Sequence, residues 1–241
     1  FKTTHSGIWS SNNCFNKARA KSIIQKLNIP TPRFFEIKKK SLNRDILNKI
    51  KKKLGKFVIK PNKSGSSFGI EIIKNKSQFN KFLNNLSGYK KKLKIHQSLI
   101  FEKYVHGQEL TVTVLKFNNK IRALDVTEIK TDNKYFDYKA KYTKGFSTHI
   151  LPANISKKNY QKCLSYAVQT HRALRCNSIS RVDFIYNKST NVQEVLEIHD
   201  KVNGKENDIK MDEEQINFLN YTEDEKKIDA AKKSTLNDIY N

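Results

Sequence analysis

The chain has 241 residues, of which 37% are hydrophobic and 29% charged, and it carries a formal net charge of +24. This length and apolar content suit one or two globular domains with a sizeable core. No apolar run reaches the roughly 18 residues that a membrane helix needs, and the first residues lack the apolar segment of a secretory signal. We therefore expect a cytoplasmic protein with no membrane partner.

Periodicity and turn residues predict helices and strands in mixed order. In chain order they are a helix over 13–27, a strand over 33–37, a helix over 42–54, strands over 57–60 and 70–73, a helix over 77–86, strands over 98–105, 107–117 and 120–130, a helix over 156–174, and strands over 180–186 and 192–199. A polar and aromatic loop over 132–149 is long enough to be functional or disordered. The mixed order predicts an α+β fold with helices against antiparallel sheets.

The positive charge comes mainly from lysine, because only seven of the 47 basic residues are arginine. Sites that read phosphates or bases tend to use arginine, so the lysine runs are most simply solvated surface. We expect no specific nucleic-acid partner, with non-specific binding through charge alone as an alternative. Residues 200–241 hold eleven acidic residues and seven lysines, so they carry −4 while residues 1–199 carry +28. That shift predicts a boundary near Asp200.

The three cysteines, Cys14, Cys163 and Cys176, are odd in number and far apart, and none forms a CxxC pair. We therefore expect neither a disulfide framework nor a zinc site, which favours a reducing cytoplasm. The only methionine is Met211. Because no initiator residue opens the chain, we expect it to be part of a longer protein.

A glycine- and serine-rich loop, "KSGSSFG" over 63–69, separates two predicted strands, and Lys60 ends the first of them. Gly65 and Gly69 permit positive φ and close backbone approach, and free N–H groups in such a loop can hold an anion. No GK[ST] follows and no helix begins there, so this is not a Walker A loop. It is typical of a lid over phosphates, as in kinases, although Lys60 alone could be an ordinary strand-end lysine.

Two carboxylates, Asp183 and Glu197, lie on neighbouring predicted strands. The two-residue period of a strand places Arg181 beside Asp183, and His199 beside Glu197. The opposite face takes apolar residues, namely Val182, Phe184, Leu196 and Ile198. The carboxylates could hold Mg²⁺ against ATP phosphates; the alternative is a surface cross-strand pair. Upstream, Glu102 and Lys103 close one strand and Glu109 opens the next, where an acidic residue often binds a ribose.

Taken in order, these motifs resemble the D-alanine–D-alanine ligases, members of the ATP-grasp superfamily. The matching stretches are "VIKPNKSGSSFGI", "FEKYVHGQELTV", "FDYKAKY" and "RVDF…VLEI", and the resemblance extends over residues 4–199. It implies an ATP-grasp fold, with two α+β subdomains and the nucleotide between their antiparallel sheets. The implied parts are the end of a linker over 1–12, a central subdomain over 13–103, a C-terminal subdomain over 104–199 and a divergent acidic tail over 200–241.

The resemblance also implies roles for individual residues. Lys17 and Lys60 would contact ATP phosphates, Ser66, Ser67 and Gly69 would form the phosphate lid, Glu102 and Lys103 would flank the adenine, Glu109 would bind the ribose, and Tyr138 would approach the nucleotide from the mobile loop. Arg181 would stabilise the transition state, with Ser66, Lys141 and Tyr142 also in catalytic positions. Asp183, Glu197 and the residue at position 199 would bind two Mg²⁺ or Mn²⁺ ions.

The implied reaction joins two D-alanine molecules for peptidoglycan synthesis. ATP phosphorylates a carboxylate to an acyl phosphate, which the amine of the second molecule attacks. Phosphoryl transfer of this kind depends on metal ions and fixed cations rather than on a covalent nucleophile, and closure of a loop excludes water. The substrates would be ATP and D-alanine, and the family's usual state leaves a homodimer open.

Three departures from the family pattern bear on activity. The matching motifs begin after the family's N-terminal domain, which we expect this chain to lack. His199 stands where the family has an asparagine metal ligand, and the acidic tail stands where the family has the segment that holds the substrate carboxylate. Because Mg²⁺ prefers oxygen ligands, His199 is expected to weaken or alter metal binding; the alternative is an edge-strand histidine with no ligand role. The alternatives are another ATP-grasp carboxylate–amine ligase and a non-catalytic ATP-binding remnant.

Overall fold

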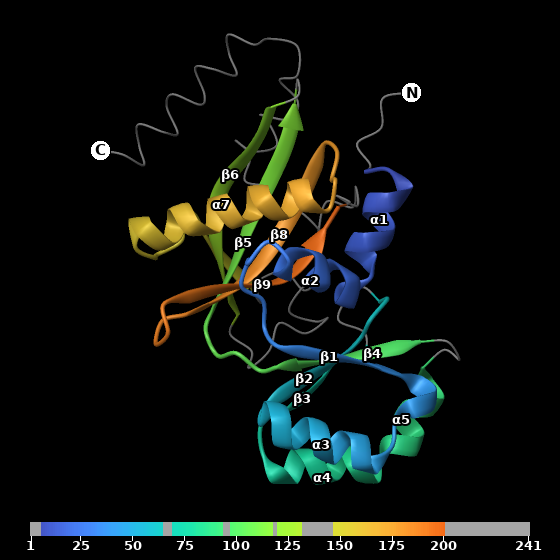
Figure 1. The fold of residues 1–241 in the computed structure, drawn as a ribbon. Helices are drawn as coiled ribbons and strands as arrows, with labels where there is room; N and C mark the ends of the chain where they lie inside the picture. The colour runs from blue at the N-terminus through green and yellow to red at the C-terminus, as the bar shows by residue number, and fades with distance from the viewer. Residues whose placement is uncertain (1–5, 65–68, 94–96, 118–119, 132–146, 201–241) are drawn as a thin grey trace. The chain divides into compact units, whose positions relative to one another are not determined.

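A computed structural model describes residues 6–64, 69–93, 97–117, 120–131 and 147–200 (Figure 1). They form two antiparallel sheets with helices packed on them, which confirms the predicted α+β class. The first sheet has four strands in the order β1-β4-β2-β3, and the second has five in the order β7-β6-β5-β8-β9.

The first sheet carries three helices against its apolar face (Figure 1). Its strands are β1 (Phe34–Lys38), β2 (Phe57–Pro61), β3 (Glu71–Ile73) and β4 (Ser98–Lys103), and its helices are α3 (Arg44–Leu54), α4 (Lys76–Asn84) and α5 (Leu86–Lys92). Asn43 caps α3 by accepting a hydrogen bond from the Ile46 N–H at 2.9 Å. Gly55, at φ +69°, ends that helix. Between helices and sheet, Leu47, Phe57 and Phe101 are fully buried.

The second sheet is covered by α7, with two shorter helices beside β9 (Figure 1). Its strands are β5 (Gln108–Phe117), β6 (Lys120–Thr131), β7 (Ser147–Ile150), β8 (Ile179–Asn187) and β9 (Val192–His199), and its helices are α1 (Ile8–Phe15), α2 (Lys17–Gln25) and α7 (Lys157–Ala173). Leu110, Val112 and Val114 of β5 are buried in this core, together with Val182 and Phe184 of β8.

The segment predicted as one helix over 13–27 forms two helices. Asn16 lies between them in an extended conformation, and its side chain accepts a hydrogen bond from the Arg19 N–H, so it caps α2. Residues 8–12, expected to be linker, are already helical. Cys14, Ala20 and Ile24 are buried in the core of the second sheet. This packing groups α1 and α2 with the second sheet, whereas the predicted division placed residues from 13 onward with the first.

Two features of the second sheet were not predicted. Strand β7 begins inside the segment expected to be a loop and pairs with β6; the rest of that loop, residues 132–146, lies outside the described residues. A bulge in β9 also breaks the register, since Asp183 faces Glu197 but Phe184 faces Val195. The predicted inward position of Leu196 was therefore wrong: Val195 and Ile198 fill the core, and Leu196 is only half-buried.

All three cysteines are reduced and buried. The sulfur atoms of Cys14 and Cys176 lie 3.8 Å apart in the second core. None of the helices in the described ranges combines the length and the hydropathy that a membrane crossing requires.

His171 makes the second core sensitive to acid. Its ring is fully buried, and Nδ1 lies 2.8 Å from the Ser180 hydroxyl. Burial, helped by Lys116 and Arg172, lowers the pKa of His171 from 6.5 to about 4. Because the folded pKa is depressed, the unfolded chain binds more protons as the pH falls below 6.5, so stability present above that pH is lost on acidification.

We expect this histidine to contribute about 2–4 kcal/mol of pH-dependent stability between neutral pH and pH ~4. The measurement is urea unfolding of the wild type and of His171→Asn across that range. His106→Asn, the same change at an exposed residue, is the control. An equal pH slope for all three proteins would contradict the expectation.

Candidate active site

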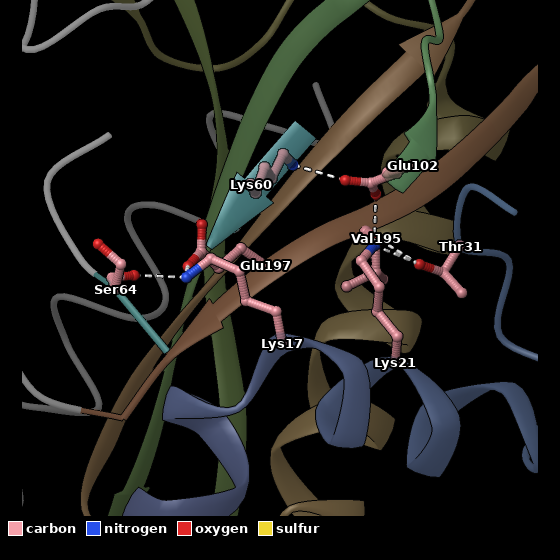
Figure 2. Close-up of polar contacts among 8 residues, drawn as sticks. All are labelled: Lys17, Lys21, Thr31, Lys60, Ser64, Glu102, Val195 and Glu197. Carbon is pink, nitrogen blue, oxygen red and sulfur yellow. Dashed lines mark hydrogen bonds and ion pairs between the residues drawn. The ribbon is translucent and has the colours of Figure 1, made fainter. Parts of the chain in front are cut away.

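Lys17 lies at the start of α2 and joins that helix to β9 and to the loop after β2 (Figure 2). Its ammonium lies 2.9 Å from Glu197 Oε1 and donates to the Ser64 carbonyl at 2.6 Å. Asn62 fixes the start of the helix, because its carbonyl accepts from the Lys17 N–H and its Oδ1 accepts from the Ala18 N–H. The Lys17 ammonium is therefore held beside a carboxylate and a loop carbonyl.

Lys60 lies on β2 with its ammonium 2.6 Å from Glu102 Oε2 (Figure 2). Glu102 comes from the adjacent strand β4, and its other oxygen lies 2.6 Å from the ammonium of Lys21 on α2. The Glu102 and Lys21 side chains are almost wholly buried. Burial raises the pKa of Glu102, but the two ammonium groups outweigh it, so the pKa lies below its ordinary value.

Arg181 and His199 both contact Asp183. Arg181 Nε lies 3.1 Å from Asp183 Oδ1, and His199 Nε2 lies 3.2 Å from Oδ2. Thr111 of β5 donates to Asp183 Oδ1 at 2.7 Å. Burial raises the pKa of Asp183, but Arg181, His199 and Thr111 together hold it well below its usual range. Asp183 is therefore a carboxylate in the folded protein at neutral pH.

Glu197 faces Asp183 directly across β8 and β9. Burial raises its pKa, but Lys17, His199 and Lys60 outweigh this and lower the pKa to about 2. Two ionised carboxylates on neighbouring strands form the oxygen donor set that Mg²⁺ prefers. Among the described residues, however, no group of three His, Cys, Asp or Glu side chains is arranged to hold a metal ion. His199 contacts Asp183 instead, so its role as a metal ligand stays a prediction.

The remaining predicted residues fall into two sets. Of those described, Gly69 has φ +70°, and a Cβ there would lie 3.1 Å from Pro61 Cγ, so a side chain would be both strained and crowded. Lys103 is exposed at the end of β4, and Glu109 is half-buried near the start of β5. Five more lie outside the described residues: Ser66, Ser67, Tyr138, Lys141 and Tyr142.

The structure adds three residues that the sequence reading missed: Lys21, Asn62 and Thr111. A signal existed for Lys21, since it follows Lys17 by four residues and so lies on the same helix face. Thr111 occupies a polar position of an alternating strand, directly opposite Asp183. No sequence signal distinguished Asn62 from the other asparagines of this chain.

Residues 23–200 match the family model described as the D-ala D-ala ligase C-terminus. The chain belongs to the D-alanine–D-alanine ligase family. A D-alanine–D-alanine ligase of Wolbachia pipientis wMel is 37% identical over 198 residues, covering 82% of this chain and 58% of that protein. Another, from Carboxydothermus hydrogenoformans, is 34% identical over 202 residues, covering 81% and 62%.

A solved structure from the ligase family supports the fold. The VanG D-Ala:D-Ser ligase of Enterococcus faecalis has a TM-score of 0.62 and 27% identity, over 81% of this chain and 55% of that one. The predicted ATP-grasp fold is thereby confirmed. The chain spans about three fifths of the length of the curated relatives that it matches.

Proposed function

We propose that this chain is the ATP-binding, catalytic part of a D-alanine–D-alanine ligase that acts in peptidoglycan precursor synthesis. The observation that carries the proposal is that Lys17 contacts Glu197 and Arg181 contacts the facing Asp183, with Lys60 near enough to lower the pKa of Glu197, within a chain of this family. Fixed cations beside ionised carboxylates suit phosphoryl transfer, which depends on positioning and charge.

In the proposed reaction, ATP phosphorylates the carboxylate of one D-alanine. The amine of the second then attacks the acyl phosphate, a carbon–nitrogen bond forms, and phosphate leaves. Lys17 and Lys60 would bind the transferring phosphates, and Arg181, held in place by Asp183, would stabilise charge in the transition state. Asp183 and Glu197 would hold Mg²⁺ or Mn²⁺, which would neutralise phosphate oxygens.

The second amino acid is the least constrained part of this proposal, because the relatives are named for D-Ala:D-Ala and D-Ala:D-Ser ligation. A different carboxylate–amine pair is the second candidate. A homodimer, a cytoplasmic location and the lack of a specific nucleic-acid partner remain expectations from the sequence.

The test is release of ADP by the purified chain with ATP and Mg²⁺, with and without D-alanine. D-alanine-dependent release, together with a dipeptide product, would support the ligase. Nucleotide binding without turnover would support the non-catalytic alternative, and no thermal stabilisation by ATP would overturn nucleotide binding altogether. Adding D-serine as the second amino acid distinguishes the two named substrate classes.

His199→Asn tests the metal assignment. Asparagine supplies the oxygen that Mg²⁺ prefers, so we expect the variant to bind MgATP about tenfold more tightly than the wild type. The measurement is a calorimetric titration with ATP at several Mg²⁺ concentrations. His106→Asn is the matched control, because His106 is exposed. Unchanged or weaker MgATP binding would leave His199 as a neighbour that contacts Asp183 and remove it from the metal site.

A further inference from the structure

Lys21 is a buried lysine for which the family resemblance supplied no role. Its ammonium lies 2.6 Å from Glu102 Oε1, and it donates to Thr31 Oγ1 at 2.8 Å and to the Val195 carbonyl at 3.3 Å (Figure 2). The residue is 2% exposed. All three ammonium hydrogens therefore have acceptors within the protein, and those acceptors come from both sheets and the segment that follows α2.

Glu102 is shared between two lysines. One carboxylate oxygen contacts Lys21 and the other contacts Lys60, at equal distances of 2.6 Å. The two lysines differ in exposure, because the Lys60 side chain is 14% exposed while that of Lys21 is 3% exposed. Lys60 is thus the partner on the open side of the carboxylate, and Lys21 is the partner on the closed side.

This asymmetry matters when a phosphate arrives. Under the proposed function, the Lys60 ammonium must contact the phosphates of the nucleotide, and this weakens its ion pair with Glu102. A buried carboxylate that loses its only cation is strongly destabilised, so a simple Lys60–Glu102 pair would resist nucleotide binding. With Lys21 on the other oxygen, Glu102 keeps a cation throughout.

We propose that Lys21 is a positioning residue that compensates Glu102, so that Lys60 is free to bind the phosphates of the nucleotide. The inference rests on the proposed function and assigns Lys21 no contact with substrate. Burial lowers the pKa of Lys21, and Glu102 opposes that shift, so the charges of these two residues depend on each other. The Val195 carbonyl that holds Lys21 lies two residues before Glu197 on β9, which links the lysine to the carboxylate side of the site.

The first test is the affinity of the whole chain for MgATP, measured by calorimetry. We expect Lys21→Met to raise the dissociation constant at least about tenfold, because Lys60 is then needed by Glu102. Lys26→Met removes the same charge at an exposed position near the end of α2, and it should leave the affinity unchanged. Lys21→Arg keeps the charge and should restore most of the affinity lost in Lys21→Met.

A second variant separates this role from a merely structural one. In Lys21→Met/Glu102→Gln, the carboxylate that holds Lys60 is neutral, so MgATP should bind more tightly than in Lys21→Met alone. If Lys21 only braced the fold, removing Glu102 as well would weaken binding further or leave it unchanged, and that result would overturn the inference. The double variant has no buried carboxylate without a cation, so we expect it to fold even if Lys21→Met does not. Its affinity for MgATP can then be compared with that of the wild type.

The outcomes also separate this inference from the proposed function. A wild-type chain that binds no nucleotide would overturn both. A wild type that binds MgATP, with a Lys21→Met variant that binds it equally well, would overturn only the role of Lys21.

Discussion

Arg181→Met is expected to lower the rate of D-alanine-dependent ADP release about 10²–10³-fold, a loss typical of removing one group that stabilises transition-state charge. The guanidinium is anchored beside Asp183, and its side chain is 31% exposed. Binding of MgATP should change much less than turnover, since Lys17 and Lys60 remain. The measurement is single-turnover ADP release alongside a calorimetric titration of MgATP.

Arg122→Met is the matched control for Arg181, because Arg122 is exposed on β6 of the same sheet. Arg181→Lys would keep the charge but lose the planar fork that contacts Asp183, so we expect an intermediate rate. A loss of MgATP affinity as large as the loss of rate would assign Arg181 to ground-state binding instead of the transition state.

Much of the fold was accessible from the sequence because local patterns and tertiary packing agree. The alternation along β8, with Val182 and Phe184 inward and Asp183 outward, survives in the structure because one face of that strand is buried. The direct pairing of Asp183 with Glu197 did not follow from this period, because the register at the turn would place Leu196 opposite Asp183 and the bulge shifts it by one residue. The order of the motifs then predicted the family, which the comparisons confirmed.

The predictions that failed depend on events that a local period cannot encode. A bulge adds one residue to β9 and shifts its inward–outward alternation by one position. A single unbroken period of two therefore placed Leu196 on the wrong face. The division of the first helix depends on Asn16, a residue suited to capping, in a chain with many other asparagines. The packing of α1 and α2 on the second sheet depends on Cys14 and Ile24, which contact residues of that sheet far away in the sequence.

The charges around the site show a further limit of sequence reasoning. The family resemblance implied that Glu102 flanks the adenine, and whether it does stays a prediction. Its two ion pairs arise because β2 lies beside β4 and α2 packs nearby. Buried ion pairs of this kind depend on which cation approaches which carboxylate in three dimensions. A lysine-rich sequence offers too many candidates for that choice to be read in advance.

Lys17→Met is expected to affect both ligand binding and stability, because Lys17 has one partner in the predicted phosphate loop and one in the predicted metal site. Loss of the ammonium should raise the MgATP dissociation constant about tenfold or more, as for other charged hydrogen bonds. It should also lower the free energy of unfolding by about 1–2 kcal/mol, a value reduced for solvent because the Glu197 side chain is 27% exposed. Calorimetry and urea unfolding at neutral pH measure the two effects.

The stability effect has a definite dependence on pH and on metal ions. In the wild type the pKa of Glu197 is lowered from 4.5 to about 2, so its stabilising contribution is present above pH 4.5 and is lost as the pH falls toward 2. In Lys17→Met the pKa of Glu197 should rise, and the loss of stability in acid should shrink.

Mg²⁺ should stabilise the Lys17→Met variant more than the wild type, because the ion replaces the missing cation beside Glu197 and Asp183. In Lys17→Met/Glu197→Gln the carboxylate that lost its cation is itself removed. This double variant should be more stable than Lys17→Met but should not regain affinity for MgATP. If the double variant recovers both, Lys17 only neutralises Glu197 and does not bind phosphate.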